Sequence, residues 1–479
     1  MNGLSNGTAT AVRRFPQGFL WGAGTSSYQI EGAVADDGRG RSIWDAFTHQ
    51  PGRVFHGETG DIACDSYHRI DEDVALIEAL GLDAYRFSVS WPRVQPDGRG
   101  AVNERGLDYY RALVGRLRQA GVMPVVTLYH WDLPQALEDR GGWAQRDTAM
   151  RLAELAELLG VALGDQVAMW ITVNEPLQTV HQGYRMGTHA PGRCEPDAAA
   201  AANHHILLAH GLALEALRRT VPAGVPIGPT LDPHPYVSLE PAAAAVADTL
   251  DAQFNRAYLD PILRGAYPDG LAAMVPAESV IADGDMATIA APIDFLGLNY
   301  YRPHHIRRGN WNDLRLGESR VAGFEDFVEY LAPDASRTVM GWPVVPDALR
   351  EMLVRLHAES GGLPLYVTEN GCASDDYIGP DGTVDDVERI EYLHDHLAAA
   401  LDAIEQGVDL RGYFHWSLLD NFEWAHGYRR RFGLHYVDFA TQRRVPKRSA
   451  GYYAQIAQTG ELLSPGTAAA ECAPERAVA

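Results

Sequence analysis

The sequence predicts an α/β fold, a single (β/α)8 TIM barrel whose extended βα loops form an active-site mouth. Eight short apolar runs alternate with amphipathic helical patterns along the 479 residues. The runs are continuous rather than alternating in polarity, as expected for parallel strands buried on both faces. The alternative, an open doubly wound sheet, lacks its Gly-rich dinucleotide turn, because residues 22–27 have no third glycine.

The expected strands follow one another at intervals filled by helical patterns. They cover residues 19–28, 84–90, 123–130, 168–175, 225–231, 293–301, 365–369 and 412–418. The clearest helical stripes lie within residues 107–117, 152–159 and 390–404, and the Ala runs at 198–202 and 242–245 also suit helices. Residues 302–345, between the sixth strand and its helix, are too long for an ordinary loop, so we expect them to border a pocket.

One barrel domain is predicted over residues 15–463. We expect a flexible N-terminal segment over residues 1–14 and a flexible C-terminal tail over residues 464–479, where the composition is small and polar. No linker divides the barrel domain and no repeat of fixed period is visible.

Composition limits the classes of partner. Forty Lys and Arg stand against 63 Asp and Glu, for a formal net charge of −23, which disfavours nucleic acid and anionic membrane surfaces. No apolar run approaches the about 18 residues of a membrane span, and the start shows no signal-peptide pattern. The four cysteines lack metal-ligand or disulfide-framework spacing. We therefore expect a cytoplasmic protein that binds no metal or cofactor. The sequence does not distinguish a monomer from a homo-oligomer.

Two of the predicted strands end in an acid beside an asparagine. "AMWITVNEP" ends the fourth strand at Asn174 and Glu175, and "LPLYVTENG" ends the seventh at Glu369. The carboxyl ends of barrel strands face one mouth, so both carboxyl groups should point into it. A lone strand-end Glu is more often a cap or an ion-pair member. A facing pair suits glycoside hydrolysis, where one acid protonates the leaving oxygen and one carboxylate acts at the anomeric carbon.

Further strand ends carry side chains that suit a sugar ligand. Indoles pack on the apolar faces of a sugar ring, while amides, imidazoles and carboxyl groups bond its hydroxyls. The side chains of this kind are His130, Trp131, Asn299, Tyr301, Trp416, Glu423 and Trp424. A strand end also supplies Arg86, which is expected to be buried. Arg86 is also expected to pair with Glu369. The adjacent histidines at 204–205 and 304–305 lack a third ligand, so we do not interpret them as a metal site.

Five motifs together resemble glycoside hydrolase family 1, the β-glucosidases and their relatives. They are "FLWGAGTSSYQIEGA", "TVNEP", "FLGLNYY", "YVTENG" and "SLLDNFEWAHGYRRRFGL", in this order within residues 15–453. The resemblance implies that Glu175 is the acid/base and Glu369 the nucleophile, with Asn174, Arg86 and Tyr301 beside them. The sugar-binding set that it implies consists of Gln29, His130, Trp131, Asn299, Trp416, Glu423, Trp424 and Phe432.

The resemblance also implies the reaction and its substrate. We expect a retaining β-glycosidase that removes terminal unphosphorylated β-D-glucosyl residues from O-glycosides such as cellobiose and aryl glucosides, with galactosyl and fucosyl residues left open. Relatives specific for 6-phospho sugars carry a Ser/Lys/Tyr set where Glu423 stands here, and thioglucosidases lack the acid that Glu175 supplies. A bell-shaped pH–rate profile is expected. The alternatives are a transglycosylating β-glycosidase, a metal-dependent barrel hydrolase and a non-catalytic sugar-binding barrel.

Overall fold

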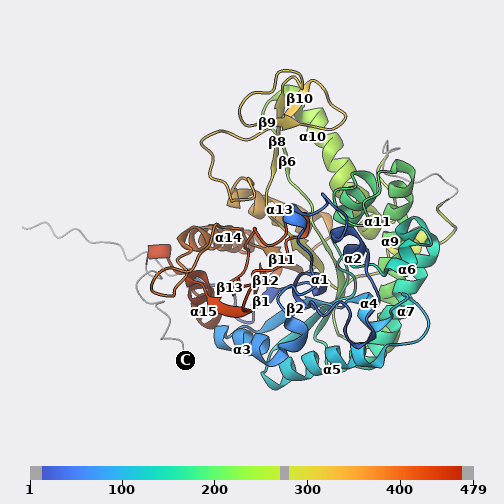
Figure 1. The fold of residues 1–479 in the computed structure, drawn as a ribbon. Helices are drawn as coiled ribbons and strands as arrows, with labels where there is room; N and C mark the ends of the chain where they lie inside the picture. Colours follow the sequence, from blue (N-terminus) through green and yellow to red (C-terminus); the bar gives the residue numbers. More distant parts are fainter. Residues whose placement is uncertain (1–12, 270–279, 467–479) are drawn as a thin grey trace, which may run out of the picture.

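A closed barrel of eight parallel strands forms the centre of the computed structural model, which describes residues 13–269 and 280–466 (Figure 1). Around the barrel the strand order is β1-β12-β11-β7-β5-β4-β3-β2. The strands are β1 (Leu20–Gly24), β2 (Ala84–Ser88), β3 (Met123–Thr127), β4 (Met169–Asn174), β5 (Ile227–Leu231), β7 (Leu296–Asn299), β11 (Leu365–Asn370) and β12 (Leu410–Trp416). This arrangement confirms the predicted fold class.

The predicted first strand, residues 19–28, is too long. β1 ends at Gly24, where it pairs with Arg86 on one side and Trp416 on the other, and α1 (Ser27–Ile30) follows. The small residues at 22–27 gave no local signal for the turn, whereas the backbone N–H of Ser27 donates to Ser88 Oγ at 2.8 Å and redirects the chain. The second and third predicted strands also end early, at Ser88 and Thr127.

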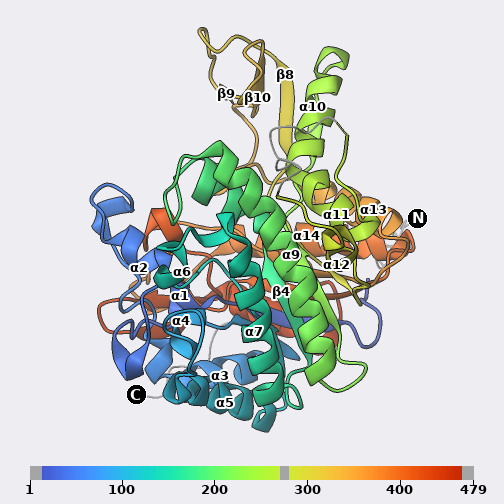
Figure 2. The same ribbon diagram turned by 90° about the vertical axis from the view of Figure 1, so that its right-hand side faces the viewer.

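Helices surround the barrel as an outer layer (Figures 1 and 2). The long ones are α3 (Ile70–Leu80), α5 (Glu104–Gln119), α7 (Arg146–Leu163), α9 (Pro196–Thr220), α13 (Pro346–Glu359), α14 (Val387–Glu405) and α15 (Arg448–Thr459). The shorter ones are α2 (Ile43–Thr48), α4 (Trp91–Val94), α6 (Gln135–Glu138), α8 (Pro176–Gln178), α10 (Ala244–Asp251), α11 (Ala257–Arg264) and α12 (Asp285–Ile289). The predicted stripes lie on α5, α7 and α14, where they are buried against the barrel.

The long connection after β7 builds a separate lobe. It contains β8 (His304–Arg308), β9 (Glu318–Arg320) and β10 (Phe327–Tyr330), which join β6 (Tyr236–Ser238) in a four-stranded sheet. With α10, this sheet stands above the barrel at the top of Figure 1. These short strands were not predicted from the sequence, but the expectation that residues 302–345 border a pocket is confirmed, as described below.

The two halves of the barrel interior differ in polarity. An apolar cluster lies in the amino-terminal half and contains Ala84, Val125, Met169, Ile171, Phe295 and Phe414. Burial of each large apolar side chain stabilises the fold by about 1.5–3 kcal/mol. Toward the carboxyl ends the strands switch to buried polar residues, including Arg86, Asn174 and Thr368. At Gly297 an added Cβ would lie 2.4 Å from Thr230 Oγ1, so this position accepts no side chain. The barrel therefore presents its polar end to the mouth.

The predicted domain boundaries stay predictions. Apart from residues 13–14 and 464–466, the two segments expected to be flexible lie outside the described residues. Among the helices of the described part of the chain, none has the length and apolar character required to cross a membrane.

Candidate active site

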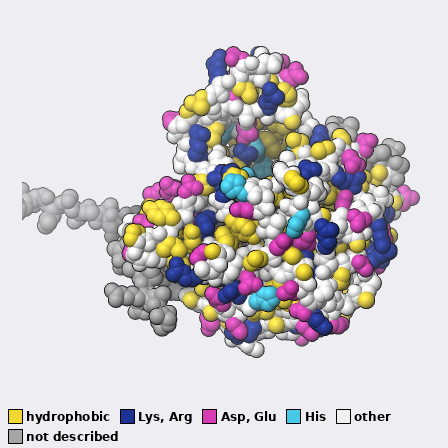
Figure 3. All heavy atoms as spheres, viewed as in Figure 1, with side chains coloured by type: hydrophobic (Ala, Val, Ile, Leu, Met, Phe, Trp, Pro, Cys, Tyr) yellow, Lys and Arg dark blue, Asp and Glu magenta, His cyan; other side chains and the backbone are white. Residues whose placement is uncertain are grey.

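A large cavity lies over the carboxyl ends of the barrel strands. Its volume is about 540 Å³, and Glu175 and Glu369 both line it. Residues of the lobe, including Arg302, His304 and Glu329, form its outer wall. In Figure 3 the surface is hollowed between this lobe and the barrel body.

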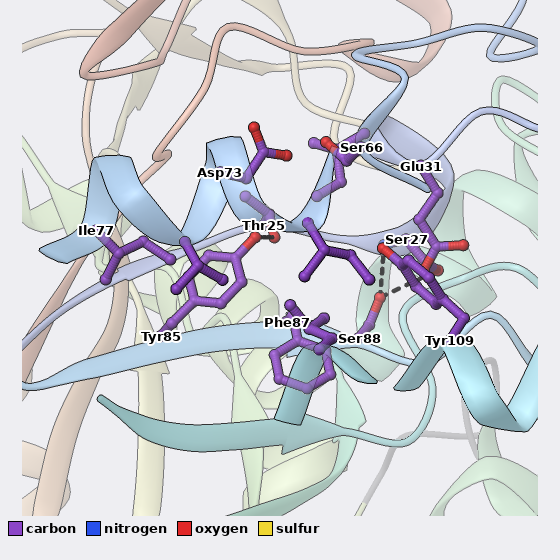
Figure 4. Close-up of a pocket in the computed structure, with 14 residues that line it drawn as sticks. Thr25, Ser27, Glu31, Ser66, Asp73, Ile77, Tyr85, Phe87, Ser88 and Tyr109 are labelled. Carbon is purple, nitrogen blue, oxygen red and sulfur yellow. Dashed lines mark hydrogen bonds between the residues drawn. The ribbon is translucent and has the colours of Figure 1, made fainter. Parts of the chain in front are cut away.

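A second, much smaller cavity lies between β2, the segment that follows β1, α3 and α5 (Figure 4). Its polar wall includes Thr25, Ser66 and Asp73, and Ser27 and Ser88 are hydrogen bonded to each other at one side. The volume is about 20 Å³, which is sufficient for one water molecule. This volume is too small for a sugar.

A third cavity, of about 570 Å³, lies at the amino ends of the strands, where Leu20, Met123 and Met169 line it, and neither Glu175 nor Glu369 belongs to its wall. The cavity over the carboxyl ends is therefore the candidate active site, because it holds both carboxyl groups.

Two hydrogen bonds fix the carboxylate of Glu369, at the end of β11. The Arg86 guanidinium donates to Oε1 at 2.6 Å, and the Tyr301 hydroxyl donates to Oε2 at 2.8 Å. Arg86 is fully buried on β2 and also donates to the backbone oxygen of Thr368 at 3.0 Å. The predicted ion pair between Arg86 and Glu369 is confirmed. Because each oxygen has its own donor, the carboxylate is held as an oriented anion facing the cavity.

The carboxyl group of Glu175 has a different environment. Burial raises its pKa well above the usual value, and the charges of Asp232 and Glu369 raise it further. Asn299 Nδ2 donates to Glu175 Oε1 at 2.6 Å, which opposes the shift in part. No permanent cation forms an ion pair with this carboxyl group among the described residues, so Glu175 is suited to carry a proton near neutral pH.

The backbone at Glu175 is strained. Its φ is +46°, in the left-handed region that favours glycine, and α8 begins at the next residue, Pro176. Two other residues of the cavity wall, Trp131 and Trp424, also have positive φ, at +78° and +47°. Such strain costs on the order of 1–3 kcal/mol per residue and clusters at functional sites.

Asn174 connects the two carboxyl groups through a buried network. Its Oδ1 accepts from Arg86 at 2.5 Å and from Asn299 at 3.1 Å, so Asn174 links the partner of Glu369 to the partner of Glu175. Asn174 Nδ2 lies 3.2 Å from His130 Nε2. Burial and the nearby Arg86 charge lower the pKa of His130 well below its usual value, so this imidazole is neutral.

The remaining predicted sugar-binding residues gather at one side of the cavity. Trp416 and Trp424 both stack against the ring of His130, at centroid distances of 5.7 and 6.0 Å, and Trp131 contacts Trp424 at 4.6 Å. Phe432 packs in one apolar cluster with Trp416. Indole surface and polar groups thus meet in one part of the wall.

Glu423 and Gln29 form the polar edge of this side. Gln29 lies on α1, is fully buried and is not part of the cavity wall. Its Nε2 donates to Asn421 Oδ1 and to the Phe422 backbone oxygen, each at 3.0 Å, and more weakly to Glu423 Oε2 at 3.5 Å. Burial, together with the charge of Glu369, raises the pKa of Glu423 to about 8. Glu423 can therefore donate a hydrogen bond to a sugar hydroxyl at neutral pH.

Several polar residues of the cavity were not among those predicted from the sequence. Asp232 directly follows β5 and lines the cavity beside Glu175. In the outer wall His304 Nδ1 and Arg302 bind Glu329 Oε1 at 3.0 and 3.1 Å. An acid after a predicted strand was the available signal for Asp232, but it lacks the neighbouring Asn that drew attention to the other two.

The adjacent histidines have structural partners. His204 Nε2 lies 2.8 Å from Asp285 Oδ2, and His304 binds Glu329. Within residues 13–269 and 280–466, no three His, Cys, Asp or Glu side chains come together in an arrangement that could hold a metal ion.

The family model for glycosyl hydrolase family 1 matches residues 11–462. The chain belongs to glycosyl hydrolase family 1. Its similarity to curated members of the family is extensive: it is 43% identical to beta-glucosidase A of Thermotoga maritima, with 94% of this chain and 99% of that protein aligned. It is 47% identical to the thermostable beta-glucosidase B of Thermobispora bispora, over 94% and 91% of the two chains.

Solved structures of the family superpose closely on this barrel. The family 1 β-glucosidase from Thermotoga maritima has a TM-score of 0.87 at 42% identity, covering 94% of this chain and 99% of that one. The same values apply to the beta-glucosidase from Thermotoga maritima in complex with deoxynojirimycin. The resemblance noted in the sequence is thus confirmed, and this family 1 glycosyl hydrolase has the barrel of its relatives.

Proposed function

We propose that this family 1 enzyme is a retaining β-glucosidase that releases terminal unphosphorylated β-D-glucosyl residues from O-glycosides such as cellobiose and aryl glucosides. The observation that carries the proposal is the contrast between two carboxyl groups in one cavity. Glu369 is an oriented anion with an Arg and a Tyr donor, whereas burial and two neighbouring carboxylates raise the pKa of Glu175. This is the division of roles that glycoside hydrolysis requires.

The first step forms a covalent intermediate. A carboxylate oxygen of Glu369 attacks the anomeric carbon, and the bond from that carbon to the leaving oxygen breaks. Glu175 gives its proton to the leaving oxygen, so the aglycone departs as a neutral alcohol. Arg86 and Tyr301 orient the attacking group throughout.

The second step uses the same residues in reverse. The Glu369 charge disappears on forming the ester, which lowers the pKa of Glu175. Glu175 then removes a proton from water as the water oxygen attacks the anomeric carbon, and the Glu369 carboxylate leaves. Two inversions at one carbon give net retention.

The glycone side of the cavity supports an uncharged sugar. His130, Glu423 and Asn299 offer neutral or protonated groups to hydroxyls, and Trp416 and Trp424 offer apolar faces. Relatives specific for 6-phospho sugars carry a Ser/Lys/Tyr set where Glu423 stands here, and Glu423, protonated or ionised, offers no positive charge to a phosphate. The relatives named beta-glucosidase support glucose as the sugar that is released. A relative from Bifidobacterium breve, 45% identical, is named bifunctional beta-D-glucosidase/beta-D-fucosidase, so fucosides remain candidate substrates.

Product stereochemistry tests this proposal. Proton NMR during hydrolysis of an aryl β-glucoside should show the β anomer of glucose first, and only later the equilibrium mixture. In parallel, kcat/KM should be far higher for the unphosphorylated aryl glucoside than for its 6-phosphate. The α anomer appearing first would contradict the retaining mechanism, and preference for the phosphate would contradict the assignment of the glycone pocket.

A further inference from the structure

A third carboxyl group lies beside the acid/base residue. Asp232 follows β5, and β5 is hydrogen bonded to β4 with Thr230 opposite Asn174. The backbone N–H of Glu175 donates to the Thr230 oxygen at 3.0 Å. The carboxyl ends of these two strands are therefore in direct contact, and Asp232 and Glu175 line the same cavity.

Asp232 is buried without a permanent counter-charge. It is 6% exposed, and its Oδ2 accepts from Gln178 Nε2 at 2.7 Å. Gln178 belongs to α8, the helix that starts directly after Glu175. Among the described residues, the nearest basic group is His234 Nε2, 3.7 Å from Oδ2. Burial lowers the pKa of His234 well below its usual value, so it is neutral. In the described residues no Lys or Arg forms an ion pair with Asp232.

We infer that Asp232 is a positioning residue that acts through Glu175, keeping the acid/base carboxyl group protonated by the proximity of a second, uncompensated carboxylate. This inference rests on the proposed roles of Glu175 and Glu369. Like charges in one poorly solvated site cannot both form easily, so ionising Asp232 makes the proton of Glu175 harder to remove.

The other groups around Glu175 do not cancel this effect. Arg86 faces it from β2 and favours its ionised form, while Glu369 faces it from β11 and favours its protonated form. Tyr301, Tyr236 and Tyr258 also face this region, and burial raises the pKa of each of these phenols, so they stay neutral. Burial raises the pKa of Asp232 itself to about 7. At alkaline pH Asp232 therefore ionises before Glu175 does.

Asp232 differs from Glu369 in one respect that matters for the reaction. The charge of Glu369 disappears when it forms the glycosyl ester, so its effect on Glu175 is present in the first step and absent in the second. The charge of Asp232, once the pH exceeds its pKa of about 7, is present in both steps. Asp232 thus sustains the basicity of Glu175 while water attacks the intermediate, and it extends the pH range over which Glu175 holds its proton in the first step.

The test is the pH dependence of kcat/KM for Asp232→Asn. The Asn side chain keeps a carbonyl oxygen for Gln178 but removes the charge. With an aryl glucoside whose leaving group needs protonation, the alkaline limb should move to lower pH by about one unit. With a dinitrophenyl glucoside, which needs no proton donor, kcat/KM should show no such loss on the alkaline side. An unmoved limb, or one at higher pH, would overturn the inference.

Glu329→Gln is the matched control. It removes one carboxylate from the same cavity, but that carboxylate is paired with Arg302 and His304. Its loss should therefore move the alkaline limb of kcat/KM much less than Asp232→Asn does. A second variant, Asp232→Ser, tests the same point if Asp232→Asn folds poorly. Labelling of each protein with a 2-deoxy-2-fluoro-β-glucoside separates the two claims. If the Glu369 peptide is labelled and the limb does not move, the inference fails while the proposed function stands; if the wild-type protein is not labelled at Glu369, the proposed function fails.

Discussion

Replacing Tyr301 with Phe removes one hydrogen bond and little else. The phenol donates to Glu369 Oε2 at 2.8 Å, and its ring packs against Trp342 and Phe432 at centroid distances of 5.4 and 6.1 Å. Phe preserves these ring contacts. Arg86 still holds Oε1, so the carboxylate keeps its charge partner but loses the donor that fixes its rotation.

The magnitude follows from the chemistry of the lost bond. A hydrogen bond to a charged group contributes about 1.5–3 kcal/mol. If this contribution is realised in the transition state for attack, Tyr301→Phe lowers the rate of forming the glycosyl-enzyme about 10- to 150-fold. The second-order rate constant for inactivation by a 2-deoxy-2-fluoro-β-glucoside measures this step alone. A decrease below about threefold, in a variant whose melting temperature is unchanged, would refute the role assigned to this hydroxyl.

Three further variants have distinct expected outcomes. Asn299→Ala removes a donor that favours ionised Glu175, so the pKa of Glu175 should rise and the alkaline limb of kcat/KM should move to higher pH; a downward shift would be contrary to this reasoning. Glu175→Gln should lower hydrolysis of poor leaving groups by about 10²- to 10⁴-fold, with added azide accelerating turnover of a dinitrophenyl glucoside, and no azide effect would count against the assignment. Arg93→Met leaves Glu31 buried without the guanidinium that binds it at 2.8 Å. This variant should lower the free energy of unfolding, measured by urea titration, by about 3–5 kcal/mol. The control is Arg350→Met, which removes the more exposed ion pair with Asp347 and should lower the free energy of unfolding by less than about 1 kcal/mol.

The two carboxyl groups could be placed from the sequence because barrel geometry alone brings the carboxyl ends of the strands together. Parallel strands in a closed barrel must place Glu175 and Glu369 at one mouth, and the structure does so. The ion pair between Arg86 and Glu369 followed from the same reasoning, since a buried Arg needs a carboxylate. These features depend on strand order and burial, and the succession of continuous apolar runs and amphipathic helical patterns in the sequence indicates both.

Other features left no local signal. The end of β1 depends on a hydrogen bond between Ser27 and Ser88, which are distant in sequence. The strands of the lobe are short and half exposed, so they lack the continuous apolar runs of the barrel. Asp232 acts through its burial and the lack of a Lys or Arg ion-pair partner among the described residues, and neither property can be read from neighbouring residues. Gln29 was singled out by family resemblance, and the structure places it behind Glu423 rather than in the cavity wall.

The central claim is that Glu369 becomes covalently bound to the sugar while Glu175 moves the proton. Intact and peptide mass spectrometry after incubation with an unphosphorylated 2-deoxy-2-fluoro-β-glucoside bearing a good leaving group tests it most directly, because the fluorine slows breakdown of the intermediate more than its formation. We expect one fluoroglucosyl group per chain, on the peptide that contains Glu369. A label on a different peptide, or no label on folded protein that hydrolyses the parent glucoside, would contradict the account.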